Sequence, residues 1–95
     1  MDLAPGKQRR NRRKHLFRKH RLTIAQYDQM LQAQGGVCAI CHQPEMVERN
    51  RHLAVDHDHR TGRIRGLLCL RCNRGLGLFL DLPERLRAAA SYLVS

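Results

Sequence analysis

Two Cys-x-x-Cys pairs constrain this chain more than any other feature of its sequence. A two-residue gap lets both sulfurs of a pair face one ion while amides of the turn donate to them. Two such pairs form the closed, tetrahedral, four-thiolate shell that is typical of structural zinc and leaves no position open for chemistry. An iron–sulfur cluster or free buried thiols are the alternatives. The predicted zinc ligands are Cys38, Cys41, Cys69 and Cys72.

A chain this small usually needs a staple, which can be a disulfide, a metal or a partner subunit. Ninety-five residues bury a limited core, and this sequence has no tryptophan and only 4% aromatic residues. It contains no apolar run of about 20 residues that would span a membrane, and no secretory signal follows its basic start. We therefore expect a cytoplasmic protein, in which paired cysteines are metal ligands more often than disulfides.

The N-terminal segment, residues 1–21, is strongly basic. The net charge of the chain is +10, and half of its 18 lysines and arginines lie between Lys7 and Arg21. A run of this kind repels itself and attracts a polyanion, so we expect DNA binding that weakens as salt rises. A disordered, solubilising tail is the alternative. The arm includes His15 and His20, and its expected DNA contacts include Arg12, Arg13 and Lys14.

Residues 22–95 are predicted to form one α+β domain. Thr23 and Gln26 match a capping box, and the helix that begins there should end at Gly35-Gly36. Residues 52–58 and 63–68 are two plausible short strands, joined by a turn with Gly62 at its tip.

Two further helices are predicted after these strands. The first begins near Cys69 and fades around Gly75 or Gly77, and the last has Pro83 in its first turn. The last helix is expected to bury one apolar stripe, formed by Leu86, Ala89, Ala90 and Leu93.

The stretch VDHDHR, residues 55–60, places two acids and two histidines in this basic chain. Hydrolysis of a phosphodiester requires a base for the attacking water and a cation for the charge that develops on phosphate. A histidine, with an ordinary pKa of about 6.5, can be the base, and a hard divalent cation needs only one or two protein oxygens. Asp56 and Asn73 can supply these oxygens, with His57 opposite the phosphate. A polar hairpin edge is the alternative.

This assignment requires an irregular strand. Successive side chains of a regular strand point to opposite faces, so Asp56 and His57 would not face one site. We therefore predict a bulge or a break between Asp56 and His59.

Three stretches, LTIAQYDQML, GGVCAICHQP and VDHDHRTGRIRGLLCLRCNRGLG, together resemble the recombination endonuclease VII family. Its members are zinc-stapled HNH, or ββα-metal, nucleases of phages and bacteria, and the resemblance covers about residues 22–93. It implies a ββα-metal core, with the four cysteines as zinc ligands. It also implies that Asp56 and Asn73 bind a catalytic Mg²⁺ or Mn²⁺, that His57 is the general base and that His59 supports it or contacts phosphate.

We therefore predict an HNH-type hydrolase, a metal-dependent DNA endonuclease in a bacterial cell or a phage-infected host. The family's namesake continues into helices for dimerisation and junction binding, whereas this chain ends at residue 95. We therefore expect a monomer or a homodimer that nicks or cuts duplex DNA, rather than one that resolves DNA junctions. The alternative is a non-catalytic zinc-ribbon module that binds DNA, although a ribbon has no use for the Asp-His pair and Asn73. Four arginines around the site would clamp phosphate or compensate the charge of the zinc thiolates: Arg63, Arg65, Arg71 and Arg74.

Overall fold

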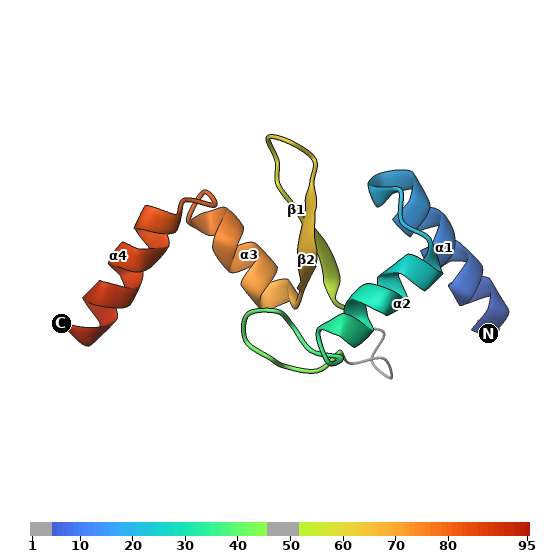
Figure 1. Ribbon diagram of the computed structural model, residues 1–95, viewed down its shortest axis with the longest axis horizontal. Coiled ribbons are helices and arrows are strands. Elements are labelled where there is room, and N and C mark those ends of the chain that lie inside the picture. Colours follow the sequence, from blue (N-terminus) through green and yellow to red (C-terminus); the bar gives the residue numbers. More distant parts are fainter. Residues whose placement is uncertain (1–4, 46–51) are drawn as a thin grey trace.

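The computed structural model describes residues 5–45 and 52–95, which form a small α+β fold. Within these residues, a two-stranded antiparallel sheet lies between two pairs of helices, and the molecule measures 51 × 29 × 25 Å (Figure 1). No helix in the described part of the chain is long and apolar enough to cross a membrane. The elements are α1 (Pro5–His20), α2 (Ile24–Ala33), β1 (Ala54–His57), β2 (Ile64–Leu68), α3 (Leu70–Leu78) and α4 (Pro83–Val94).

Helix α2 begins and ends as its sequence predicts. The Thr23 hydroxyl accepts from the Gln26 amide at 3.1 Å, and the Gln26 side chain accepts from the Thr23 amide at 2.9 Å, which completes the capping box. After the helix, Gly35 and Gly36 adopt φ values of 72° and 78°, which glycine tolerates better than other residues. The chain can therefore turn sharply into the first cysteine pair.

Tyr27 of α2 is the centre of a small core. Its side chain is 1% exposed, and its hydroxyl lies 2.6 Å from both a Glu45 carboxylate oxygen and the Leu53 carbonyl. The guanidinium of Arg12 lies 4.3 Å from the centre of the tyrosine ring, which ties α1 to α2 through a cation–π contact. The other buried side chains of this core are Leu16, Leu22, Cys38, Leu53, Val55, Leu67 and Leu68.

The hairpin contains the predicted irregularity. Asp56 pairs with Gly66 while His57 pairs with Ile64, so Arg65 is the extra residue of a bulge. The prediction of a bulge or break at Asp56 is confirmed. The extra residue lies on β2, opposite the bond between Asp56 and His57, where a bulge disrupts the ladder and increases the local twist.

The turn of the hairpin is held by Asp58. Its carboxylate accepts from the amides of Arg60 at 2.8 Å and Thr61 at 3.3 Å, and these bonds lower the pKa of Asp58. Gly62, predicted at the tip, has a φ of 78°. The Asp58 side chain is therefore occupied in shaping the turn.

Gln34, just after α2, joins the sheet to the first cysteine pair. Its side-chain oxygen accepts from the Leu67 amide at 2.9 Å, and its side-chain nitrogen donates to the carbonyls of Leu67 at 3.0 Å and Val37 at 2.8 Å. A Cβ at Gly66 would lie 3.2 Å from the same Gln34 oxygen, so a larger residue would crowd this contact.

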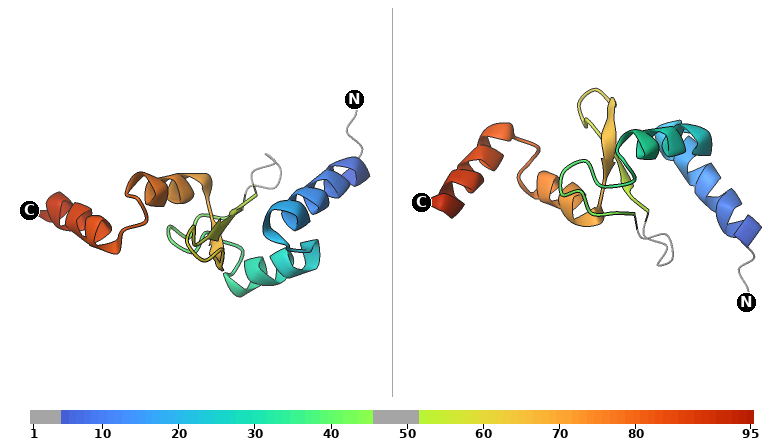
Figure 2. Two further views of the ribbon diagram at one scale, coloured as in Figure 1. Left: turned by 90° about the horizontal axis from the view of Figure 1, so that it is seen from above. Right: turned by 60° about the horizontal axis from the view of Figure 1, so that its bottom comes forward.

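The predicted buried stripe on α4 is wrong. All of α4 lies in the described part of the chain, and none of its side chains is buried; Leu93 is 80% exposed and Ala90 is exposed, whereas Leu86 and Ala89 are half-buried. The helix leads away from the hairpin at one end of the molecule (Figure 2). Its apolar pattern therefore predicts the helix correctly but not what covers it.

Candidate metal centres and active site

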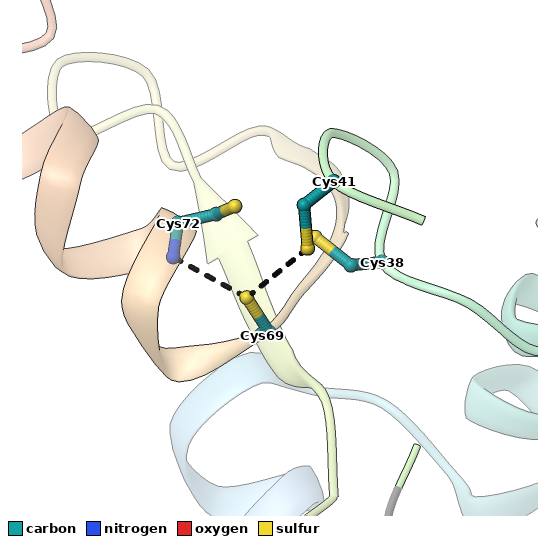
Figure 3. A group of neighbouring side chains, drawn as sticks. All are labelled: Cys38, Cys41, Cys69 and Cys72. Carbon is teal, nitrogen blue, oxygen red and sulfur yellow. Dashed lines mark hydrogen bonds between the residues drawn. The ribbon is translucent and has the colours of Figure 1, made fainter. Parts of the chain in front are cut away.

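The four cysteines converge from two elements on one point (Figure 3). One potential ligand atom from each lies within 4.8 Å of all the others, and the sulfurs of Cys41 and Cys69 are 3.6 Å apart. Bonds of about 2.3 Å to a tetrahedral zinc would separate the sulfurs by about 3.8 Å. The cluster therefore fits a four-coordinate metal ion without rearrangement of the chain.

Local backbone geometry aims these sulfurs. The Cys38 sulfur accepts from the Ile40 amide at 3.4 Å, and Cys69 is the N-cap of α3, where its sulfur accepts from the Cys72 amide at 3.4 Å. The cysteine side chain thus takes the place that serine or aspartate commonly holds at a helix start. Amide donors to the sulfurs favour thiolates, which are the forms that bind metal.

The pKa values of two thiols diverge. Burial opposes ionisation of Cys38, but backbone amide donors outweigh it and lower its pKa to about 6. Burial, hydrogen bonds among the thiols and the charge of Cys38 raise the pKa of Cys72 to about 12. One thiolate forms readily and then opposes the next, so a divalent cation would relieve this repulsion and favour full ionisation.

Asp56 is a buried acid on β1, opposite the bulge of β2. Its residue is 8% exposed, and both carboxylate oxygens are bound by Arg65, with Nε 2.7 Å from Oδ2 and Nη2 3.1 Å from Oδ1. Hydrogen bonds to Asp56 raise the pKa of the Arg65 guanidinium, so it stays charged. A buried carboxylate that already holds a cation through both oxygens fits a hard metal ion in its donor chemistry.

Three histidine rings, one of them that of the next residue, His57, lie close to one another. The ring centres of His57 and His59 are 4.8 Å apart, and that of His20, the last residue of α1, is 5.7 Å from His57. Burial, helped by Lys19, His57 and His15, lowers the pKa of His20, which favours its neutral form. Sequence reasoning assigned His20 to the basic arm alone, because the sequence does not show that the end of α1 lies against the hairpin.

Asn73 lies in the first turn of α3. Its backbone amide donates to the Cys69 carbonyl at 2.9 Å, and the residue is partly buried. Helix α3 packs against both β1 and β2, which gives the ββα arrangement expected for the site. Asn73 is therefore fixed to the cysteine cluster on a helix that contacts the strand of Asp56.

The predicted arginines divide into two groups. Arg65 lies within the site, bound to Asp56 and 3.3 Å from Asp81 Oδ2, whereas Arg63, Arg71 and Arg74 are exposed around it. Of the arm residues, Arg12 lies against Tyr27, and Lys14 is exposed on α1. Arg13 belongs to α1 as well. Their roles toward DNA stay predictions.

Comparison with known proteins supports the family resemblance. The profile of the family described as recombination endonuclease VII matches residues 11–95. The gene 59 proteins of mycobacteriophages L5 and D29 are 41% and 42% identical over 75 and 73 residues, which cover 78% and 76% of this chain. These matches span 44% and 43% of the two phage proteins, so the chain spans less than half of their length.

A solved structure is similar to this chain in fold. The ββα-Me type II restriction endonuclease Hpy99I superposes with a TM-score of 0.55 and 32% identity, over 85% of this chain and 47% of that one. The ββα arrangement, the four-cysteine cluster and the profile match point to the same conclusion. The chain belongs to the recombination endonuclease VII family.

Proposed function

We propose that this chain is an HNH-type endonuclease that hydrolyses DNA phosphodiesters with a divalent cation. The observation that carries the proposal is the irregular pairing between buried Asp56 and the next residue, His57, in a strand that packs against the helix of the second cysteine pair. Membership of an endonuclease family and likeness to a ββα-Me nuclease support the same reaction class.

In the proposed mechanism, His57 accepts a proton from the attacking water. His59, whose ring centre is 4.8 Å away, supports that ring or contacts the phosphate. Asp56 and Asn73 would hold Mg²⁺ or Mn²⁺, which stabilises the charge on phosphate and on the departing 3′ oxygen.

The cysteine cluster has a separate task in this proposal. Cys38, Cys41, Cys69 and Cys72 would bind zinc, as the four-thiolate set and its spacing indicate. A saturated sulfur shell offers no position for substrate, so this zinc stabilises the fold and positions Asn73.

DNA would be held by the basic side chains around the site and on α1. We propose an arm at residues 1–21 and a nuclease domain at residues 22–95, acting in the cytoplasm as a monomer or a homodimer. Each phosphate contact that is lost should reduce the salt dependence of binding by about one unit of slope. The proposed contacts are Arg12, Arg13, Lys14, Arg63, Arg65, Arg71 and Arg74.

Cleavage of supercoiled plasmid with Mg²⁺ or Mn²⁺ tests this function. We expect the wild-type protein to nick the plasmid and His57→Ala to lose about 10²- to 10⁴-fold in rate, the usual contribution of a general base. His42→Asn is the matched control, because His42 is exposed and its φ of 64° suits asparagine. Tight DNA binding without cleavage under any metal would instead support the zinc-ribbon module.

A further inference from the structure

We propose that Arg65 is an internal counter-cation of the metal site. Its guanidinium holds Asp56 while the site is free of metal, and it transfers to Asp81 when the divalent cation binds. This inference rests on the proposed role of Asp56 as a metal ligand. It assigns Arg65 a task inside the site that differs from contacting DNA.

Arg65 contacts both carboxylate oxygens of Asp56. Nε and Nη2 reach the two oxygens at 2.7 and 3.1 Å, a two-point contact of the kind that arginine makes most strongly with acids. Nη2 is also 3.4 Å from the His57 carbonyl, which fixes the fork above the bulge. In the absence of metal, this cation compensates the charge of a carboxylate that is only 8% exposed.

A divalent cation cannot simply be added to this arrangement. A Mg²⁺ ion requires an oxygen at about 2.0 to 2.1 Å and octahedral space around it, and a guanidinium at hydrogen-bond distance occupies that space. The two cations would also repel each other at close range. Asp56 therefore binds either Arg65 through both oxygens or the metal ion, and Arg65 must find another partner in the second case.

Asp81 is the second partner that the fold provides. Its Oδ2 already lies 3.3 Å from Arg65 Nη2, and it comes from the turn between α3 and α4, far from Asp56 in sequence. Leu80 and Asp81 both have left-handed φ values, 60° and 57°, and the Asp81 amide donates to the Leu76 carbonyl at 2.8 Å. Such backbone is costly for residues other than glycine, and here it brings a carboxylate back to β2. A small rotation of the Arg65 side chain would exchange Asp56 for Asp81.

Binding of Mn²⁺ to the zinc-loaded protein without DNA tests the proposal, measured by electron paramagnetic resonance or calorimetry at pH 7.5. Arg65→Gln removes the guanidinium that competes with Mn²⁺ for Asp56. Because the charge-assisted bond to Asp56 exists only in the metal-free state, its loss destabilises that state alone. We therefore expect Mn²⁺ to bind at least about tenfold more tightly. The matched control is Arg60→Gln, an exposed arginine of the hairpin turn with the same change in net charge, for which affinity should change less than twofold. Unchanged or weaker binding by Arg65→Gln would overturn the proposal. If Arg65→Gln does not fold, Arg65→Lys keeps the charge without the fork and should give a smaller increase.

A double-mutant cycle tests the transfer to Asp81. Asp81→Asn should weaken Mn²⁺ binding several-fold when Arg65 is present and less than twofold in the Arg65→Gln background. Equal weakening in both backgrounds would contradict the transfer, because it would reflect only the lost negative charge. Asp56→Asn separates this inference from the proposed function. If that variant still binds Mn²⁺ at the same site, the proposed ligand is wrong; if it loses the ion while Arg65→Gln behaves as wild type, the inference about Arg65 alone is wrong.

Discussion

The four-cysteine cluster and the Asp56 site differ in how their candidate ligand atoms are arranged for a cation. One potential ligand atom of each cysteine already lies within 4.8 Å of those of the other three. At Asp56, the place of the cation is taken by Arg65. A structural site must hold its metal permanently, whereas a catalytic site must admit an ion together with water and substrate. The difference indicates that zinc would be part of the folded protein and that the second metal would bind by exchange.

Loss of the cysteine cluster should have the largest effect. Cys69→Ser removes a sulfur ligand while serine can still cap α3, and binding of structural zinc contributes about 10 to 16 kcal/mol in zinc-finger peptides. We expect this variant to lose its cooperative thermal transition and to bind less than one zinc per chain, measured by circular dichroism and metal analysis. A chelator should do the same to the wild-type protein. A folded, zinc-free Cys69→Ser protein would show that the fold does not depend on metal at the cysteine cluster, and the proposed difference between the two sites would be smaller.

Gln34→Ala should have the next largest effect, because Gln34 links the cysteine cluster to the sheet. The change leaves the amide of buried Leu67 without the Gln34 oxygen, which should cost about 1 to 3 kcal/mol in the free energy of unfolding. The control is Gln32→Ala, at an exposed glutamine of α2, which should change stability by less than about 0.5 kcal/mol. Chemical denaturation of both zinc-loaded variants measures the difference. Similar stability of the two would show that the cysteine cluster holds the sheet without this link.

Substitution of His20 should have a smaller effect on stability, and this effect should depend on pH. Its pKa is lowered in the folded protein, so protonation favours the unfolded chain, and its contribution to stability is complete above about pH 6.5 and lost as the pH falls. We expect melting temperatures to fall less between pH 7.5 and 5.5 in His20→Gln than in the wild-type protein. The reference variant is His42→Asn, because His42 is exposed and its left-handed backbone suits asparagine better than glutamine. If the melting temperatures of His20→Gln and wild type respond identically to pH, His20 at the end of α1 is not buried against the hairpin as described.

The smallest effect is expected on α4. Leu93→Ala should change the free energy of unfolding by less than about 0.5 kcal/mol, because the side chain is 80% exposed. Leu67→Ala is the contrasting variant, since Leu67 is fully buried in the core and its loss should cost about 2 to 5 kcal/mol. Denaturation of the two proteins measures both values. A loss of more than 1 kcal/mol in Leu93→Ala would show that α4 packs against the domain or against a second copy.

The sequence predicted the features that depend on neighbouring residues. The capping box at Thr23, the turn at Gly62 and the two cysteine pairs each involve residues a few positions apart, where short-range geometry decides the structure. The bulge at Asp56 was predictable for another reason: two adjacent side chains of a regular strand cannot face one site.

Contacts between distant segments were not predictable in the same way. Nothing local shows that His20 at the end of α1 returns to His57, or that Asp81 returns to Arg65. The apolar stripe of α4 predicted a helix, but a periodic pattern does not reveal whether a partner covers it. Arg65 itself was assigned to phosphate or to the zinc charge, because its distance to Asp56 depends on the bulge.

Metal-dependent nicking of supercoiled plasmid by Asp56→Asn tests the central claim most directly. The variant keeps the size of the side chain and the zinc cluster but removes the charge that would bind the catalytic cation. We predict a folded, zinc-containing protein that binds DNA and does not nick it at any Mg²⁺ or Mn²⁺ concentration that saturates the wild type. Cleavage by Asp56→Asn at the wild-type rate and with the wild-type metal dependence would contradict the account.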